Sequence, residues 1–105
     1  MDNGVTFFEK EGELCAGLFG EIDHHTAKGE RDKIDEMLFS KRPARLILDF
    51  SEVKFMDSSG IGLIIGRAEI AAGLGTSVSL VGLSAADKKL VRLSGIGKIK
   101  NLTIE

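Results

Sequence analysis

The stretch Arg45-Leu46-Ile47-Leu48-Asp49-Phe50 is the most strand-like part of the chain. Its few polar positions are typical of a central strand in a sheet that is covered on both faces. Helical patterns flank this stretch, over residues 24–39 before it and from about Ser59 to Gly73 after it. Strands that alternate with helices are joined in βαβ units, so we expect a largely parallel sheet.

Shorter strand-like runs extend this sheet on either side. Residues 5–8 and 14–19 are β-type runs, and Glu11-Gly12 between them predicts a hairpin turn. Residues 77–82 predict a further strand, and the apolar residues between Ile99 and Ile104 predict a last one. The expected fold is a single α/β domain over residues 1–105, with a mixed, mostly parallel sheet of four to five strands and three to four helices.

The helix expected over residues 24–39 has a recognisable start and end. Asp23 offers a side-chain oxygen to open it, and Pro43 ends the segment. Its buried face is expected to hold Ala27, Ile34, Met37 and Leu38. Its polar coat is expected to hold Lys28, Glu30, Asp32, Lys33 and Glu36.

A third helix is predicted by Ser84-Ala85-Ala86-Asp87, in which a serine precedes an acidic residue by three positions. We expect this helix to bury Ala86, Leu90 and Leu93. It should stop at Gly95, because glycine readily adopts the left-handed conformation that ends a helix.

Composition excludes several classes of function. The chain has 105 residues, with 14 Lys plus Arg and 16 Asp plus Glu, so its formal charge is −2. This balance provides neither a basic surface for nucleic acid nor a polybasic membrane tether, and no apolar stretch is long enough to span a bilayer. A single cysteine, Cys15, excludes an internal disulfide and a multi-thiolate metal site. Because the N-terminus also lacks an export signal, we expect a cytoplasmic protein.

The most unusual segment is Phe55-Met56-Asp57-Ser58-Ser59-Gly60, between the central strand and the second helix. Functional groups of open α/β sheets gather at the carboxyl ends of strands, and residues 20–25 and 81–84 occupy the same position after two other strands. A serine directly before a helix usually caps it. It is also a place where free N–H groups and the helix dipole tolerate a phosphate. The residues alone leave both roles open for Ser58 and Ser59.

The second helix has an unusual outer face. Its core stripe is expected to be Ile61, Ile64, Ile65, Ala68 and Ala72. The opposite face, where charged residues are usual, holds Gly62, Leu63, Gly66 and Ile70, with Arg67 and Glu69 at its sides. Such a face either packs within the domain or lets another protein approach the helix backbone closely. We favour a docking surface, because a chain of this length has few elements left to cover it.

Other chemistry has weaker support. Neighbouring helical residues such as His24 and His25 do not face the same way, and no Cys/His cluster accompanies them, so no metal site is expected. The Gly-x-Ser-x-Gly elbow of hydrolases and the Gly-x4-Gly-Lys-Ser/Thr phosphate loop are both absent. We therefore expect no catalytic residue and no cofactor, and a small hydrolase or nucleotide-binding enzyme is the least favoured alternative.

Together these motifs resemble the STAS domain of bacterial anti-anti-sigma factors. The resemblance rests on Phe55-Met56-Asp57-Ser58-Ser59-Gly60-Ile61-Gly62, with Gly20-Glu21-Ile22-Asp23 upstream and Leu93-Ser94-Gly95 downstream, and it spans nearly the whole chain. Residues 23–27 and 63–67 look especially like the sporulation branch, whose members antagonise the anti-sigma kinase of the forespore sigma factor.

The resemblance implies a phosphorylation switch and no enzymatic activity of the chain itself. In this family the unphosphorylated domain binds an anti-sigma factor, a serine kinase with a GHKL-type ATP site, and so frees the sigma factor. The kinase phosphorylates the first serine after the motif aspartate, which is Ser58 here, and a serine phosphatase restores the active form. The partner-binding residues that the resemblance implies are Asp23, His24, Asp57, Ser59, Gly60, Gly62, Leu63, Gly66 and Arg67. The alternative is a STAS module for another partner, such as a stress-response kinase, a stressosome-like assembly or a lipid-transport complex.

Overall fold

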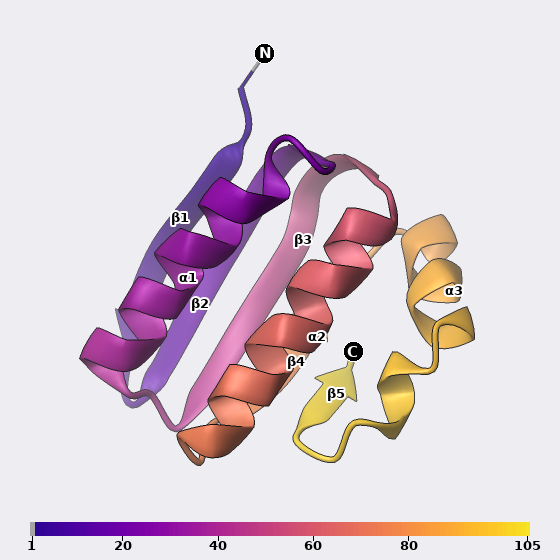
Figure 1. Ribbon diagram of the computed structural model, residues 1–105. Coiled ribbons are helices and arrows are strands. Elements are labelled where there is room, and N and C mark those ends of the chain that lie inside the picture. The colour runs from indigo at the N-terminus through magenta and orange to yellow at the C-terminus, as the bar shows by residue number, and fades with distance from the viewer. Residues whose placement is uncertain (1) are drawn as a thin grey trace.

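The computed structural model describes residues 2–105 and places five strands and three α-helices within them (Figure 1). Met1, with which the expected domain begins, lies outside the described residues. In chain order the elements are β1 (Gly4–Lys10), β2 (Glu13–Ile22), α1 (Ala27–Lys41), β3 (Arg45–Met56), α2 (Ser58–Gly73), β4 (Ser77–Val81), α3 (Ala85–Leu93), the short 3₁₀ helix η1 (Ile96–Lys98) and β5 (Leu102–Ile104).

The sheet is mixed and mostly parallel, as predicted. Its strands lie side by side in the order of the sequence, β1-β2-β3-β4-β5. Only β1 and β2 are antiparallel. Their hairpin turns at Glu11 and Gly12, which both have positive φ angles of 48° and 82°. Such a turn matches the right-handed twist of the two strands that it joins.

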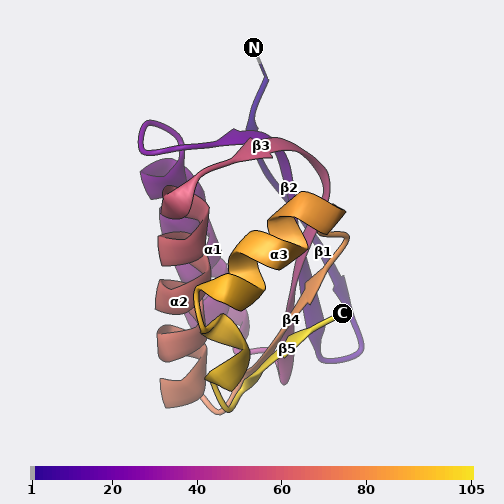
Figure 2. The ribbon, with the colours of Figure 1, turned by 90° about the vertical axis from the view of Figure 1, so that its right-hand side faces the viewer.

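The helices α1 and α2 cover one face of the sheet (Figure 2). The prediction that both faces of the central strand are covered is therefore wrong. In β3, Leu46, Leu48 and Phe50 are buried against the helices, whereas Arg45 and Asp49 lie on the other face and are only half-buried. The Arg45 guanidinium contacts the carboxylates of Glu13 and Glu105 there, at 3.0 and 2.9 Å. The strand thus has the alternation of a sheet with one solvated face.

The first helix begins later than its sequence pattern predicts. α1 starts at Ala27, whereas the pattern placed its start at residue 24 with Asp23 as the cap. The Asp23 carboxylate instead accepts the N–H groups of His25 and Thr26 at 2.8 and 3.1 Å. The Thr26 hydroxyl accepts the N–H of Asp23 at 3.0 Å. These reciprocal bonds hold residues 23–26 in a turn, so the helix starts only after it.

The buried face of α1 contains a carboxyl group that the pattern placed in the polar coat. Ala27, Ile34 and Leu38 are buried as predicted, whereas Met37 is only half-buried. Glu30 lies between them on the stripe that faces the sheet and is 3% exposed. Neither of its carboxylate oxygens has a hydrogen-bond partner in the described part of the chain. The expectation that Glu30 is solvated is therefore wrong.

The third helix packs through a different residue than predicted. Its start and end agree with the pattern: the Ser84 hydroxyl accepts the N–H of Asp87 at 3.1 Å, and Gly95 has a φ of 84°. Val91 is its only buried residue, whereas Ala86 is exposed and Leu90 and Leu93 are 37% and 77% exposed. Because Val91 is buried and its neighbour Leu90 is exposed, the helix is rotated by one residue position from the predicted orientation.

Candidate functional site

Two of the three expected loops meet at the carboxyl ends of β2 and β3. Ile22 and Met56 are partners in the parallel register, and the N–H of Asp57 donates to the carbonyl of Ile22 at 3.2 Å. The loop of residues 23–26 therefore lies beside the start of α2. The third loop meets β3 earlier, because a Cβ at Gly82 would lie 2.7 Å from the backbone nitrogen of Ser51. It is thus not part of this junction.

Asp57, and neither of the serines, caps α2. Its carboxylate accepts the N–H of Ser59 at 2.8 Å, which is the usual bond of an N-cap residue. Ser58 is the first residue of the helix and its side chain is exposed to solvent, whereas Ser59 is half-buried. Of the two roles left open for Ser58 and Ser59, the capping role is therefore wrong. Because another residue caps the helix, the Ser58 hydroxyl is left accessible for a different role.

Gly60 is required by close packing. It is buried, and a Cβ at this position would collide with the side chain of Met56 and come within 3.6 Å of Ile22. Both of these neighbours belong to the ends of the central strands. Gly60 therefore fixes how closely the first turn of α2 sits on the sheet, and with it the position of Ser58.

The neighbouring loop combines a fixed carboxylate with two exposed imidazoles. The N–H of His25, helped by that of Thr26, holds the pKa of the Asp23 carboxyl below its usual range. The rings of His24 and His25 lie 3.9 Å apart between centroids. No group of three His, Cys, Asp or Glu side chains suited to a metal ion occurs within residues 2–105.

The rotation of α2 differs from the predicted one. Leu63 was expected on the open face and Arg67 at its side, but they are only 2% and 5% exposed. The guanidinium Nε of Arg67 lies 2.7 Å from the Asp35 carboxylate of α1. Burial lowers the pKa of Arg67 and raises that of Asp35, and their mutual attraction opposes both shifts. Leu63 and Arg67 thus lie between the two helices and not on the exposed face of α2.

Two other glycines of α2 do lie open. Gly62 is exposed and Gly66 is half-buried, and a Cβ at either position would have no atom within 4 Å. Neither glycine has a positive φ. A glycine inside a helix costs about 1 kcal/mol relative to alanine, and the described residues contain nothing that requires it at these two positions. We call this exposed strip, which also holds Ser58, the glycine flank.

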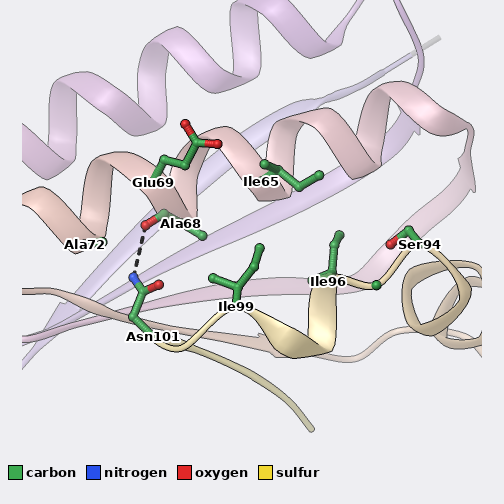
Figure 3. A pocket seen from close by; sticks show the side chains of 9 residues that line it. Ile65, Ala68, Glu69, Ala72, Ser94, Ile96, Ile99 and Asn101 are labelled. Atoms are coloured by element: carbon green, nitrogen blue, oxygen red, sulfur yellow. Dashed lines mark hydrogen bonds between the residues drawn. The ribbon is translucent and has the colours of Figure 1, made fainter.

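An apolar groove lies between α2 and the segment that contains η1 (Figure 3). Its volume is about 380 Å³, and Ile65 and Ala72 of α2 face Ile96 and Ile99 across it. Ile65 and Ala72 were expected in the core, but Ile65 is half-buried and Ala72 exposed. The Asn101 amide closes one end of the groove by donating to the carbonyls of Ala68 and Thr76, at 3.0 and 3.1 Å.

A second groove lies on the other side of α2, between the N-terminal turns of α1 and α2. It has a volume of about 370 Å³. The residues that line it are His24, Ala27, Lys28, Arg31, Ser59, Gly62 and Leu63. We call it the basic groove.

The contribution of Lys28 and Arg31 to this region was missed in the sequence. Both had the appearance of ordinary surface residues, and only their spacing of three positions directly after the 23–26 turn could have singled them out.

The exposed aromatic residue at the end of β3 was also missed. Phe55 is 52% exposed and lies three residues before Ser58.

The fold and the site define a small α/β domain that presents an accessible serine at the start of a helix, beside an open helix flank. The model of the STAS domain family matches residues 6–104, so the chain belongs to the STAS domain family. This confirms the resemblance seen in the sequence motifs.

Known proteins are similar to the chain over most of its length. The anti-sigma F factor antagonist of Paenibacillus polymyxa is 33% identical over 99 residues, which are 94% of this chain and 85% of that protein. The anti-sigma F factor antagonist of Lysinibacillus sphaericus is 38% identical over 81 residues, which are 76% of this chain and 68% of that protein. The solved structure of the Bacillus cell fate determinant SpoIIAA in its phosphorylated form matches with a TM-score of 0.73 and 28% identity, covering 96% of this chain and 90% of that one.

No helix within residues 2–105 has the length and apolar character needed to cross a membrane.

Proposed function

We propose that this chain is an anti-sigma factor antagonist whose binding is controlled by phosphorylation of Ser58. In its unphosphorylated form it binds an anti-sigma factor and so releases a sigma factor. The observation that carries this proposal is the exposed Ser58 side chain at the first position of α2, next to an open glycine flank. The similarity to anti-sigma F factor antagonists supports the choice of partner.

The partner is proposed to be a serine kinase with a GHKL-type ATP site. The Ser58 oxygen attacks the γ-phosphorus of ATP, the bond to the ADP oxygen breaks, and the hydroxyl proton is released. The start of α2 accommodates the product, because the positive end of the helix dipole faces the phosphate. A serine phosphatase later hydrolyses the ester. The chain is thus a substrate of both enzymes and not a catalyst.

Phosphorylation is proposed to end binding through charge. A phosphoserine carries close to two negative charges, and here they would stand beside the Asp57 carboxylate. Like charges that meet at a close interface cost several kcal/mol. The partner would therefore dissociate from the phosphorylated form, and no rearrangement of the domain is needed.

The remaining site residues are proposed to act in two ways. Asp57, Ser59 and Gly60 shape the loop that presents Ser58, whereas Asp23, His24, Gly62 and Gly66 belong to the docking surface. Leu63 and Arg67 support that surface from within. We further propose that residues 1–105 act as one domain in the bacterial cytoplasm, without direct contact with nucleic acid or membrane.

Phosphate mapping tests the proposal. The chain is incubated with the anti-sigma factor of the same organism and ATP, and the modified residue is located by mass spectrometry. We expect a single phosphate on Ser58, and none on a Ser58→Ala variant. Labelling at another residue, or undiminished labelling of that variant, would reject the assignment. If the chain is modified only by a stress-response kinase, the partner is wrong although the modified site is right.

A further inference from the structure

The basic groove has a charge opposite to that of the chain as a whole. The chain has a formal charge of −2, yet the ionisable side chains that line this groove are His24, Lys28 and Arg31. Among residues 2–105, no carboxylate lines it. A concave site with one sign of charge concentrates ions and side chains of the opposite sign.

The charges of the groove are only partly balanced by the fold. The Lys28 ammonium lies 2.9 Å from the Asp32 carboxylate, but both side chains are more than half exposed, at 72% and 57%. A pair of this kind is weak and exchanges readily with water or another anion. Arg31 forms no ion pair among residues 2–105 and is exposed. Positive charge therefore remains available to a ligand from outside.

The groove is continuous with the proposed docking surface. Ser59 and Gly62 of its wall are direct neighbours, in sequence or across one helical turn, of the exposed Ser58. Its floor is apolar, because Ala27 and Leu63 lie there, and the open side of Gly62 leaves room for a main chain to approach. A volume of about 370 Å³ accommodates a few side chains of a partner. The ion pair between Arg67 and Asp35 keeps the two helical walls together.

Resting on the proposed function, we propose that the basic groove receives an acidic segment of the anti-sigma factor, with Asp or Glu carboxylates placed against Lys28 and Arg31. Charge complementarity is the reason for this choice of occupant. A phosphate on Ser58 would add negative charge at the edge of the same groove and weaken its hold on that segment. Recognition and release thus use one patch of the surface.

Charge reversal with a matched control tests this proposal. The double variant Lys28→Glu/Arg31→Glu is compared with Lys98→Glu/Lys100→Glu, which changes the net charge equally at exposed positions outside the groove. The affinity of each for the anti-sigma factor of the same organism is measured by titration calorimetry at low and high salt. We expect the groove variant to bind at least tenfold more weakly, with a flatter salt dependence, and the control to stay within about twofold of wild type.

A neutral variant guards against a folding defect. Lys28→Gln/Arg31→Gln removes both charges while keeping long polar side chains, and circular dichroism checks that its fold is unchanged. It should bind with intermediate affinity. Equal losses in the groove and control variants, or wild-type affinity in both groove variants, would overturn the proposal.

The failure of the proposed function would look different. If the wild-type chain itself does not bind the anti-sigma factor, both the function and this inference fail. If wild type binds and is phosphorylated on Ser58 but the groove variants are unaffected, only the inference fails. Inorganic phosphate or ATP without the partner should not shift the NMR signals of Lys28 and Arg31 at millimolar concentration, and a strong shift would identify a small-anion site instead.

Discussion

Replacing Glu30 by leucine should stabilise the protein in a pH-dependent way. The Glu30 carboxyl is 3% exposed, neither oxygen has a hydrogen-bond partner, and the group lies on the apolar stripe of α1. Burial, with a smaller contribution from the negative charge of Asp23, raises its pKa from 4.5 to about 7. At neutral and higher pH the folded chain must therefore keep an unpartnered carboxylate in its core.

The size of the effect follows from the shift in pKa. Each unit is worth about 1.4 kcal/mol, so the charged group destabilises the fold by about 3 kcal/mol at pH 8, where it is ionised in both states. Because the folded pKa is the higher one, the folded state binds more protons between pH 4.5 and 7, and stability falls as the pH rises through this window. At pH 5 the group is mostly protonated in the folded state, and the penalty shrinks to about 1 kcal/mol.

Urea unfolding at pH 5 and pH 8 measures this difference. The chain has no Trp and no Tyr, so far-UV circular dichroism is the suitable signal. Glu30→Leu should exceed wild type in unfolding free energy by about 2 kcal/mol more at pH 8 than at pH 5. Glu36→Leu, at an exposed position of the same helix, is the control and should change stability by less than about 0.5 kcal/mol at either pH. An equal gap at both pH values would show that the Glu30 carboxylate is solvated or paired, and would refute the reasoning.

Three further predictions concern α2 and its contacts. Gly66→Ala should raise the unfolding free energy by about 0.5–1 kcal/mol yet weaken binding to the anti-sigma factor. The control Gly29→Ala, in an open part of α1, should give the same gain in stability with unchanged affinity. Unchanged affinity of the Gly66→Ala variant would argue against docking on the glycine flank. Arg67→Met leaves the Asp35 carboxylate without its partner and should lower the unfolding free energy by about 2–4 kcal/mol in urea titrations, so a neutral result would mean that the pair is not formed. Asn101→Asp replaces an amide that donates two hydrogen bonds by a carboxylate that faces the same two carbonyl oxygens. This variant should lower the melting temperature more than Asn101→Ala does. The reverse order would show that those hydrogen bonds contribute little.

The strands and the serine loop were predictable because their signals are local. Each of these signals lies within a short window of sequence. They are a hairpin turn, alternating apolar residues, and an acid–serine–serine–glycine motif between a strand and a helix. The start of α1 was misplaced for a local reason too. Asp23 and Thr26 satisfy each other in a turn, and this competes with the capping role that a lone Asp23 suggests.

The spacing of apolar residues could not predict which face of α2 is buried. Its residues are almost all apolar or small, so more than one stripe at helical spacing looks like a core. The true orientation is set by Leu63 and Arg67, and the burial of an arginine depends on an aspartate in another helix. Asp35 lies 32 positions earlier in the chain, and no pattern within one helix reveals such a pairing. The basic groove is hidden from the sequence for the same reason, since its two walls come from different helices.

The affinity of the chain for its anti-sigma factor, measured with and without a phosphate on Ser58, tests the switch most directly. We expect tight binding of the unmodified chain and a loss of at least about 30-fold, or about 2 kcal/mol, once Ser58 carries the phosphate. Equal affinity of the two forms, with the phosphate verified on Ser58, would contradict the account.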